Sequence, residues 1–295
     1  MAPRTALYPF LVTLLAVAAL SLMDVFMKTA SLAVGAYSAL LLRSWLGVAL
    51  MLPIYMARGG RWPEAKVRRI HAIRGTVGTA MALAFFSALV LLPVAEAIAL
   101  AFIAPIIALA LAAILLKERI GRSAIMAAGL GLVGVGVIVS GRLGSDEATS
   151  ESALGVALVL ASAFLYAWNL VLQRQQALVA QPVEIGTAHN LIVGVLLLAG
   201  APFFLTLPQE AEIWQTIIAA TLLSVGGAVL LAWSFARAEA QALVPVEYSG
   251  FVWACLFGWL LLGEEIALTT LAGAALIVVA CWIAAPRKAP EPVVA

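Results

Sequence analysis

Residues 36–92 read AYSALLLRSWLGVALMLPIYMA, then RGGRWPEAKVRRIH, then AIRGTVGTAMALAFFSALVLL. Two mostly apolar stretches flank a short segment that holds five Lys or Arg residues and one acid. A helix of about 20 apolar residues crosses a hydrocarbon core of about 30 Å. Because Lys and Arg near the ends of spans resist translocation, a basic segment of this kind stays in the cytoplasm. The stretch predicts two membrane helices joined on the cytoplasmic side.

The same pattern continues along the whole chain of 295 residues. Hydrophobic residues make up 64% of the sequence, charged residues only 11%, and the mean hydropathy is +1.10. A soluble domain usually carries about a quarter charged residues, so this composition predicts an all-α membrane protein. We expect ten transmembrane helices, at approximately residues 8–29, 36–57, 72–92, 95–116, 122–140, 153–173, 184–206, 212–235, 241–262 and 267–285.

The charges between these spans indicate the orientation. Placing both termini in the cytoplasm puts fourteen of the seventeen basic residues on that side: Arg4, Arg58, Arg61, Lys66, Arg68, Arg69, Arg74, Lys117, Arg119, Arg122, Arg174, Arg237, Arg287 and Lys288. The outer gaps collect acids instead: Asp146, Glu147, Glu151, Glu210, Glu212, Glu264 and Glu265. We therefore expect a multi-pass protein of the plasma (inner) membrane with cytoplasmic termini.

A short repeated block divides the chain into two halves. LLKERI at 115–120 aligns without a gap with LLGEEI at 261–266, an offset of 146 residues. We expect five-helix repeats in 1–143 and 153–295, joined by a polar external linker at 144–152, with a short cytoplasmic tail. Because five is odd, the second repeat enters from the opposite side, which gives the inverted repeat of many secondary transporters.

Ten spans, two halves and a Leu-Leu-(Lys/Gly)-Glu turn before the last span of each half resemble the EamA-type drug/metabolite transporter superfamily. The resemblance covers almost the whole chain and is closest to bacterial exporters of amino acids, including aromatic ones. It implies a central cavity between the halves, with the fifth and tenth spans at the periphery.

The sequence lacks the motifs of several classes of enzyme and of ATP-driven pumps. The sequence has no G-x-x-x-x-G-K-[ST], no G-x-S-x-G and no H-E-x-x-H, and it contains only two histidines. We therefore expect no enzyme activity, no cofactor, no metal and no nucleic-acid partner. Gly129, Gly131, Gly134 and Gly136 lie inside an apolar span, where small residues allow close helix packing.

Polar groups in hydrocarbon are costly, so each one at depth is a candidate pathway residue. Asp24 and Lys28 lie one turn apart on one face of the first span, where they could pair or snorkel to the outer end. Arg43, seven residues into the second span, is expected to bind a substrate carboxylate or to form a salt bridge with Asp24. Glu96 in an outer turn and His71 in an inner loop are expected to be solvated.

The sixth and seventh spans place aromatic rings and neutral polar groups at membrane depth: Tyr166, Trp168, Asn169, Gln173, His189 and Asn190. This combination suits an aromatic or apolar solute with a zwitterionic head. Tyr166 and Trp168 could instead belong to an interfacial aromatic belt. We favour the pathway interpretation, in which Asn169 and His189 hold the amino or carboxyl head.

The ninth span carries an acid, Glu247, a turn or so from its start. A carboxylate at this depth must be paired, protonated or in contact with water. Glu247 is therefore the candidate proton carrier of a proton-coupled exporter; the alternative is a facilitator that uses no proton carrier. At the offset of 146, Tyr248 corresponds to Phe102. If the rings of the sixth span are structural, we expect the pathway around Tyr248 and Trp253.

Two prolines are candidate hinges. Pro105 lies mid-span and is expected to kink its helix. Pro245, at the start of the ninth span, frees a backbone carbonyl for a polar contact.

These observations favour a secondary transporter that exports small neutral or zwitterionic metabolites, above all amino acids, by alternating access. Few charges lie in the spans, which argues against phosphorylated cargo. The alternative within transport is a multidrug exporter for lipophilic cations, with Glu247 or Asp24 as the counter-charge. The alternative from another class is a membrane-embedded scaffold or enzyme. The expected partners are a small solute and the lipid bilayer, with the protein a monomer or a weak homodimer.

Overall fold

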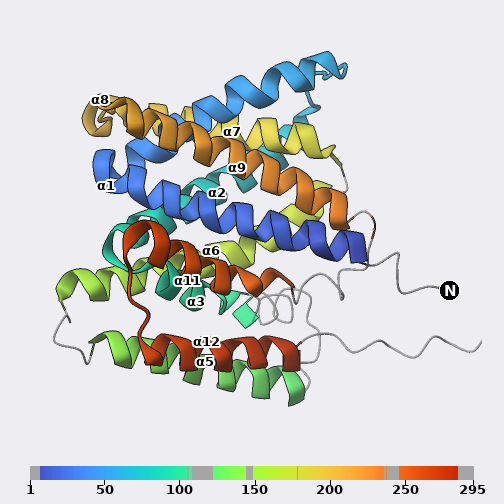
Figure 1. Ribbon diagram of the computed structural model, residues 1–295. Coiled ribbons are helices and arrows are strands. Elements are labelled where there is room, and N and C mark those ends of the chain that lie inside the picture. The colour runs from blue at the N-terminus through green and yellow to red at the C-terminus, as the bar shows by residue number, and fades with distance from the viewer. Residues whose placement is uncertain are drawn as a thin grey trace, which may run out of the picture.

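A computed structural model describes residues 7–104, 106–107, 122–143, 149–177, 179–235, 237 and 246–284. Within these residues the regular structure is helical and contains no strand. Figure 1 shows the helices lying side by side along roughly one direction. The helices are α1 (Leu7–Ala57), α2 (Ala65–Leu91), α3 (Val94–Ala101), α5 (Arg122–Leu143), α6 (Ser150–Ala177), α7 (Pro182–Leu198), α8 (Ala201–Phe204), α9 (Ala211–Phe235), α11 (Ser249–Leu262) and α12 (Leu268–Ala284).

In the described part of the chain, four helices have the length and apolar composition needed to cross a membrane. These segments are Tyr8–Ala57, Ala65–Leu91, Ser150–Leu170 and Ala211–Ser234. Shorter apolar helices cover Gly129–Gly141, Pro182–Leu198, Ser249–Leu262 and Leu268–Ala280. Described helices therefore overlap the predicted spans, although α3 covers only the start of span 95–116 and the number of spans stays a prediction.

The first two predicted spans form one helical element, α1, with a sharp bend and no separate loop. The bend is at Gly35, whose φ of 82° lies in the left-handed region that glycine tolerates best. Figure 1 shows the chain reversing direction there. The next residues hold the turn against the end of α7 and α8, since the Tyr37 hydroxyl donates to the Leu197 carbonyl and Ser38 Oγ donates to the Phe204 carbonyl at 3.2 Å.

The distribution of side chains differs from that in a water-soluble protein, because the surface as well as the core is rich in apolar residues. Large apolar side chains stand exposed, among them Leu132 at 66% and Trp259 at 61%. Charged side chains such as Lys28 and Glu96 are buried. An apolar surface of this extent suits lipid rather than water. The protein is therefore built as a multi-pass membrane protein.

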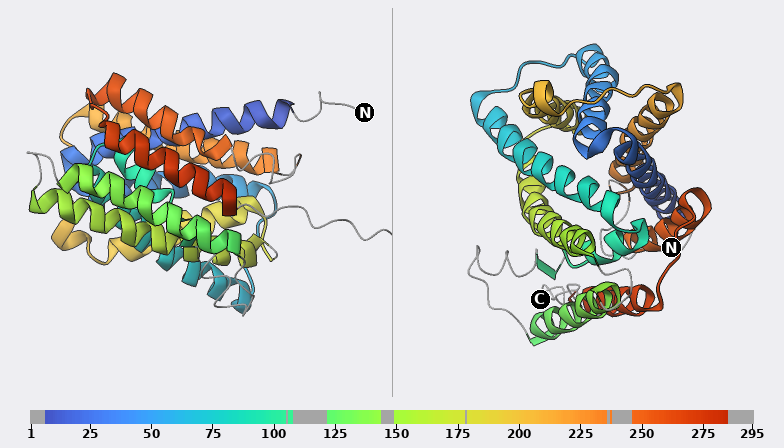
Figure 2. Two further views of the ribbon diagram at one scale, coloured as in Figure 1. Left: turned by 90° about the horizontal axis from the view of Figure 1, so that it is seen from below. Right: turned by 90° about the vertical axis from the view of Figure 1, so that its left-hand side faces the viewer.

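Helices from the two halves of the chain pack against one another. α1 packs on α9, α7 and α11, α2 packs on α6, and α3 packs on α11. α5 and α12 form a pair along one edge of the bundle, as Figures 1 and 2 show. Gly134 and Gly273 let this pair approach closely, because a Cβ on Gly273 would lie 2.6 Å from the Gly134 carbonyl oxygen. The predicted packing role is confirmed at Gly131, where an added Cβ would collide with Ile106 Cδ1, and at Gly134, whereas Gly129 and Gly136 face open space.

Candidate functional site: a polar series between two end clusters

Beyond the end of α2, a lysine and a glutamate from distant parts of the chain form a buried ion pair. Lys28 Nζ lies 2.5 Å from Glu264 Oε1 and donates to the Leu92 carbonyl at 2.6 Å. The Val94 N–H donates to Glu264 Oε2 at 2.8 Å. The two charged side chains are only 10% and 12% exposed. These four residues are the Lys28–Glu264 cluster, which ties α1 to the α2–α3 turn and to the segment after α11.

Of the two interpretations of Asp24 and Lys28, a direct pair within the span is therefore wrong. Lys28 extends toward the helix end, where a carbonyl and the Glu264 carboxylate meet it. Asp24 instead interacts electrostatically with Arg43. The prediction that Glu96 is solvated is also wrong: it lies in the first turn of α3 and is buried.

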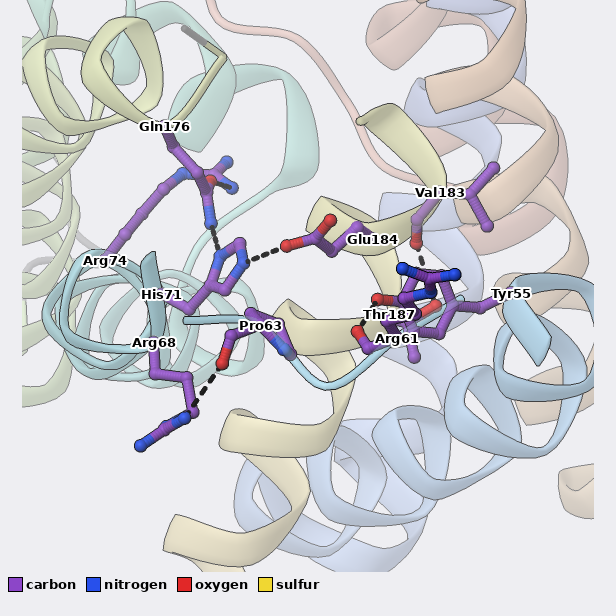
Figure 3. A network of polar contacts seen from close by, with 10 residues as sticks. All are labelled: Tyr55, Arg61, Pro63, Arg68, His71, Arg74, Gln176, Val183, Glu184 and Thr187. Carbon is purple, nitrogen blue, oxygen red and sulfur yellow. Dashed lines mark hydrogen bonds and ion pairs between the residues drawn. The ribbon is translucent and has the colours of Figure 1, made fainter. Parts of the chain in front are cut away.

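At the opposite end of α2, His71 lies between side chains of two other helices (Figure 3). Its Nε2 is 3.0 Å from Glu184 Oε1 of α7, and its Nδ1 contacts the amide nitrogen of Gln176 of α6. Arg74 Nη1 donates to Gln176 Oε1 at 2.5 Å. We call His71, Arg74, Gln176 and Glu184 the His71–Glu184 cluster. The prediction that His71 is solvated is wrong, because α2 begins already at Ala65 and packs there against α6 and α7.

The bonding pattern assigns the hydrogen positions in this cluster. Arg74 can only donate, so the atom of Gln176 that faces it must be the carbonyl oxygen. The Gln176 amide N–H is then left to donate to His71 Nδ1. The His71 hydrogen consequently sits on Nε2 and is donated to Glu184.

Arg43 lies between three helices in the interior. Its Nη1 is 3.4 Å from Ser224 Oγ of α9 and 3.6 Å from Met23 Sδ, and its guanidinium carbon is 5.4 Å from the centre of the Phe86 ring of α2. The buried Nε has no hydrogen-bond partner among the described residues. The guanidinium thus keeps an N–H donor at Nε that the described residues leave without an acceptor.

The two polar candidates of α7 point to different neighbours. His189 faces Gly78 of α2, where an added Cβ would lie 2.8 Å from the imidazole Cε1. Its buried Nδ1 is without a partner in the described structure, and the ring interacts electrostatically with Arg74 and Arg43. Asn190 packs against Gly47 of α1, and its Nδ2 donates to the Gly186 carbonyl at 2.9 Å.

The three candidates of α6 differ in their surroundings. Tyr166 interacts electrostatically with Glu247 and Arg74, although its ring keeps exposed surface. Asn169 is buried, and its Oδ1 lacks a hydrogen-bond partner within the described ranges. Trp168 is 45% exposed and lies about 200° around the helix from Tyr166, so the two rings do not share a face.

Two aligned positions of the two halves meet where α3 ends and α11 begins. The Phe102 and Tyr248 rings are in edge-to-face contact, with centroids 5.2 Å apart and planes at 89°. Trp253 stacks on Phe257 at 5.7 Å, and its buried Nε1 has no partner in the part of the chain that the structure describes. Pro105 and Pro245, the predicted hinges, lie outside the described residues.

Together these groups form a polar series in the interior, whose members lie within electrostatic range of one another rather than in direct contact. Electrostatic interactions link Asp24 to Arg43, Arg43 and Arg74 to His189, and Arg74 through Tyr166 to Glu247. The series starts one helical turn from Lys28 and reaches the His71–Glu184 cluster through Arg74. The sequence had assigned Arg74 to the cytoplasmic charges and gave no signal for Ser224.

Comparisons with known proteins agree with this picture. The profile of the EamA-like transporter family matches residues 7–140 and 153–285. The pseudopaline exporter CntI of Pseudomonas aeruginosa is 29% identical over 276 residues, which cover 92% of this chain and 93% of that protein. An uncharacterized transporter of Helicobacter pylori is 27% identical over 282 residues, covering 93% of each chain.

A solved crystal structure matches with a TM-score of 0.63 over 94% of this chain and 96% of its own, at 24% identity, and shows the fold alone. The family match covers both halves of the chain. The protein belongs to the EamA-like transporter family.

Proposed function

We propose that the protein exports small zwitterionic metabolites, amino acids including aromatic ones among them, by alternating access between two inverted five-helix halves. The polar series is the observation that carries the proposal. In an apolar bundle, an unpaired buried polar atom costs about 1–3 kcal/mol. Arg43 Nε, Arg74 Nε, His189 Nδ1 and Asn169 Oδ1 all lack partners among the described residues. Groups of this kind are suited to bind a polar solute in transit.

The helix pairs support the inverted repeat. At the offset of 146, the first part of α1 corresponds to α6, and α2 corresponds to α9; α2 begins at Ala65 and α9 at Ala211. Exchanging the halves therefore turns the α1–α9 contact into the α6–α2 contact, and both are present. The same exchange maps the α5–α12 pair onto itself. This is the pattern expected when two similar halves pack around a pseudo-twofold axis.

The direction of transport and the membrane are part of the proposal. A relative carries the name of an exporter, and the basic loops favour cytoplasmic termini in the inner membrane. Glu247 is the proposed proton carrier if export is proton-coupled. A facilitator that runs down the solute gradient would need no such carrier.

Flux into proteoliposomes that contain only this protein tests the proposal. The panel comprises L-alanine, L-phenylalanine, the lipophilic cation tetraphenylphosphonium and glucose 6-phosphate, with protein-free liposomes as the control. We expect saturable flux of the two amino acids and none of the sugar phosphate. Saturable flux of the lipophilic cation alone would favour the drug-exporter alternative. Flux of all four compounds equal to that of empty liposomes would contradict a transport function and favour the scaffold.

A further inference from the structure

We propose that Asp24 and Arg43 form the subsite that binds the charged head of the solute, with a carboxylate on Arg43 and an ammonium group on Asp24. This inference rests on the proposed function and names the chemistry of its substrate. It defines the substrate class as α-amino acids and compounds with the same head.

Arg43 offers a fork of N–H donors with little to bind. A guanidinium carries five N–H groups that match the two oxygens of a carboxylate. Among the described residues, Arg43 contacts the hydroxyl of Ser224 at 3.4 Å, the sulfur of Met23 at 3.6 Å and the face of the Phe86 ring. These are long or weak contacts for a full positive charge in an apolar bundle. A solute carboxylate would supply the missing anion and form charge-assisted hydrogen bonds.

Asp24 offers the opposite charge. It is half-buried and interacts electrostatically with Arg43. No N–O distance between these two described side chains falls within the 4.0 Å of an ion pair. The nearby cation Lys28 is held by Glu264 and the Leu92 carbonyl. Two unlike charges therefore lie within electrostatic range of each other without forming a direct ion pair, an arrangement that suits a zwitterionic ligand.

The position of the pair suits a transport site. Asp24 lies four residues before Lys28, which is about 6 Å along a helix. The Lys28–Glu264 cluster thus lies one turn above the subsite and bridges α1, the α2–α3 turn and the segment after α11. Phe86 and Met23 place apolar surface beside the guanidinium. A bound amino acid would lie next to the Lys28–Glu264 cluster, on the side that faces the interior of the bundle.

The charges also predict what the subsite rejects. A lipophilic cation would meet Arg43, and a dianionic phosphate would meet Asp24, so each is opposed by a like charge. A zwitterion satisfies both side chains at once. This is the physical basis for preferring amino acids to the other cargo classes.

Three matched compounds test the subsite: L-phenylalanine, 3-phenylpropanoate, which lacks the ammonium group, and 2-phenylethylamine, which lacks the carboxylate. Binding is measured on the full chain in lipid nanodiscs for the wild type, Arg43→Gln and Asp24→Asn. Arg58→Gln, at an exposed site beyond α1, is the matched control. Arg43→Lys keeps the charge and loses the fork, so it serves if Arg43→Gln does not fold.

We expect Arg43→Gln to weaken the binding of L-phenylalanine and 3-phenylpropanoate by about 10- to 100-fold, while the binding of 2-phenylethylamine stays the same or strengthens because a like charge is removed. Asp24→Asn should weaken the binding of L-phenylalanine and 2-phenylethylamine, while that of 3-phenylpropanoate stays the same or strengthens. Arg43→Lys should fall between wild type and Arg43→Gln, and Arg58→Gln should match the wild type. Parallel losses for all three compounds would overturn the subsite while leaving the proposed function intact if amino acid flux persists. Absence of L-phenylalanine binding to the wild type would overturn the assigned head-group chemistry.

Discussion

At one end of α2, Lys28 and Glu264 meet as a buried ion pair, whereas at the other end His71 lies between a neutral amide and a carboxylate. Each cluster joins helices of both halves of the chain. The first holds both charges away from solvent, and the Glu264 carboxylate accepts from both Lys28 and the Val94 N–H. In the second, the hydrogen bonds run through the Gln176 amide and the His71 imidazole. With the hydrogen positions assigned above, these two groups carry no net charge.

The two clusters differ in the free energy needed to pull their residues apart. Pulling apart a buried ion pair leaves two desolvated charges. Separating the His71–Glu184 cluster breaks hydrogen bonds to a neutral amide and a neutral imidazole, and the Glu184 carboxylate is already 18% exposed to solvent. The Lys28–Glu264 end should therefore be the harder end to open. In an alternating-access transporter, such an asymmetry sets which conformation is populated without solute.

The largest expected effect follows from removing one charge of the ion pair. Lys28→Met leaves Glu264 buried without a cation and should lower the free energy of unfolding by about 3–5 kcal/mol. Chemical unfolding of the purified protein in detergent measures the loss. The double variant Lys28→Met/Glu264→Gln removes both charges and should recover most of it. Glu265→Gln changes the exposed neighbouring acid and should have little effect, so a loss equal to that of Lys28→Met would contradict the assignment.

A smaller loss is expected at the opposite end. Gln176→Leu removes the amide that joins His71 and Arg74, and it leaves buried polar atoms without partners. The expected loss is about 1–3 kcal/mol in the same unfolding measurement. Gln175→Leu alters the exposed neighbour on α6 and is the matched control. A Gln176→Leu loss larger than that of Lys28→Met would reverse the proposed order of the two ends.

The smallest effect is expected at Glu184, the acid of the His71–Glu184 cluster. Glu184→Gln keeps an oxygen that can accept from His71 Nε2, and the Glu184 side chain is 18% exposed. The loss should be no more than about 1 kcal/mol. Glu264→Gln, the equivalent change at the other end, should cost several times more because it leaves Lys28 buried without an anion. Equal losses for the two substitutions would remove the distinction between the clusters.

Apolar runs were sufficient to locate helices, because a span must be long and uncharged. The predicted span 212–235 and the observed α9 differ by one residue at the start. Charged residues at the ends of helices were harder to predict. Lys28 and Glu264 are 236 residues apart in sequence, so only the packed structure reveals their contact. Local spacing suggested Asp24 as the partner of Lys28, and the long lysine side chain reaches elsewhere.

His71 and Glu96 are two further residues whose burial could not be predicted from the sequence. Both stand near predicted span ends, where polar residues usually meet water. α2 begins several residues before the predicted span start, and although most of that first part is exposed, His71 contacts side chains of α6 and α7 and is buried. The sequence predicted three members of the polar series, Arg43, Asn169 and His189. Only the three-dimensional arrangement shows that Arg74 links this series to the His71–Glu184 cluster.

The central claim is that the two clusters close opposite ends of an alternating-access transporter. Spin-label pairs at Leu32 and Leu268, near the Lys28–Glu264 cluster, and at Arg69 and Gln181, near the His71–Glu184 cluster, report the two ends. Their distance distributions are measured by pulsed electron paramagnetic resonance in a background without Cys255 and Cys281, in the wild type and in Lys28→Met. The account predicts that Lys28→Met lengthens the Leu32–Leu268 distance and shortens or narrows the Arg69–Gln181 distance. An unchanged Leu32–Leu268 distribution, or lengthening at both ends together, would contradict it.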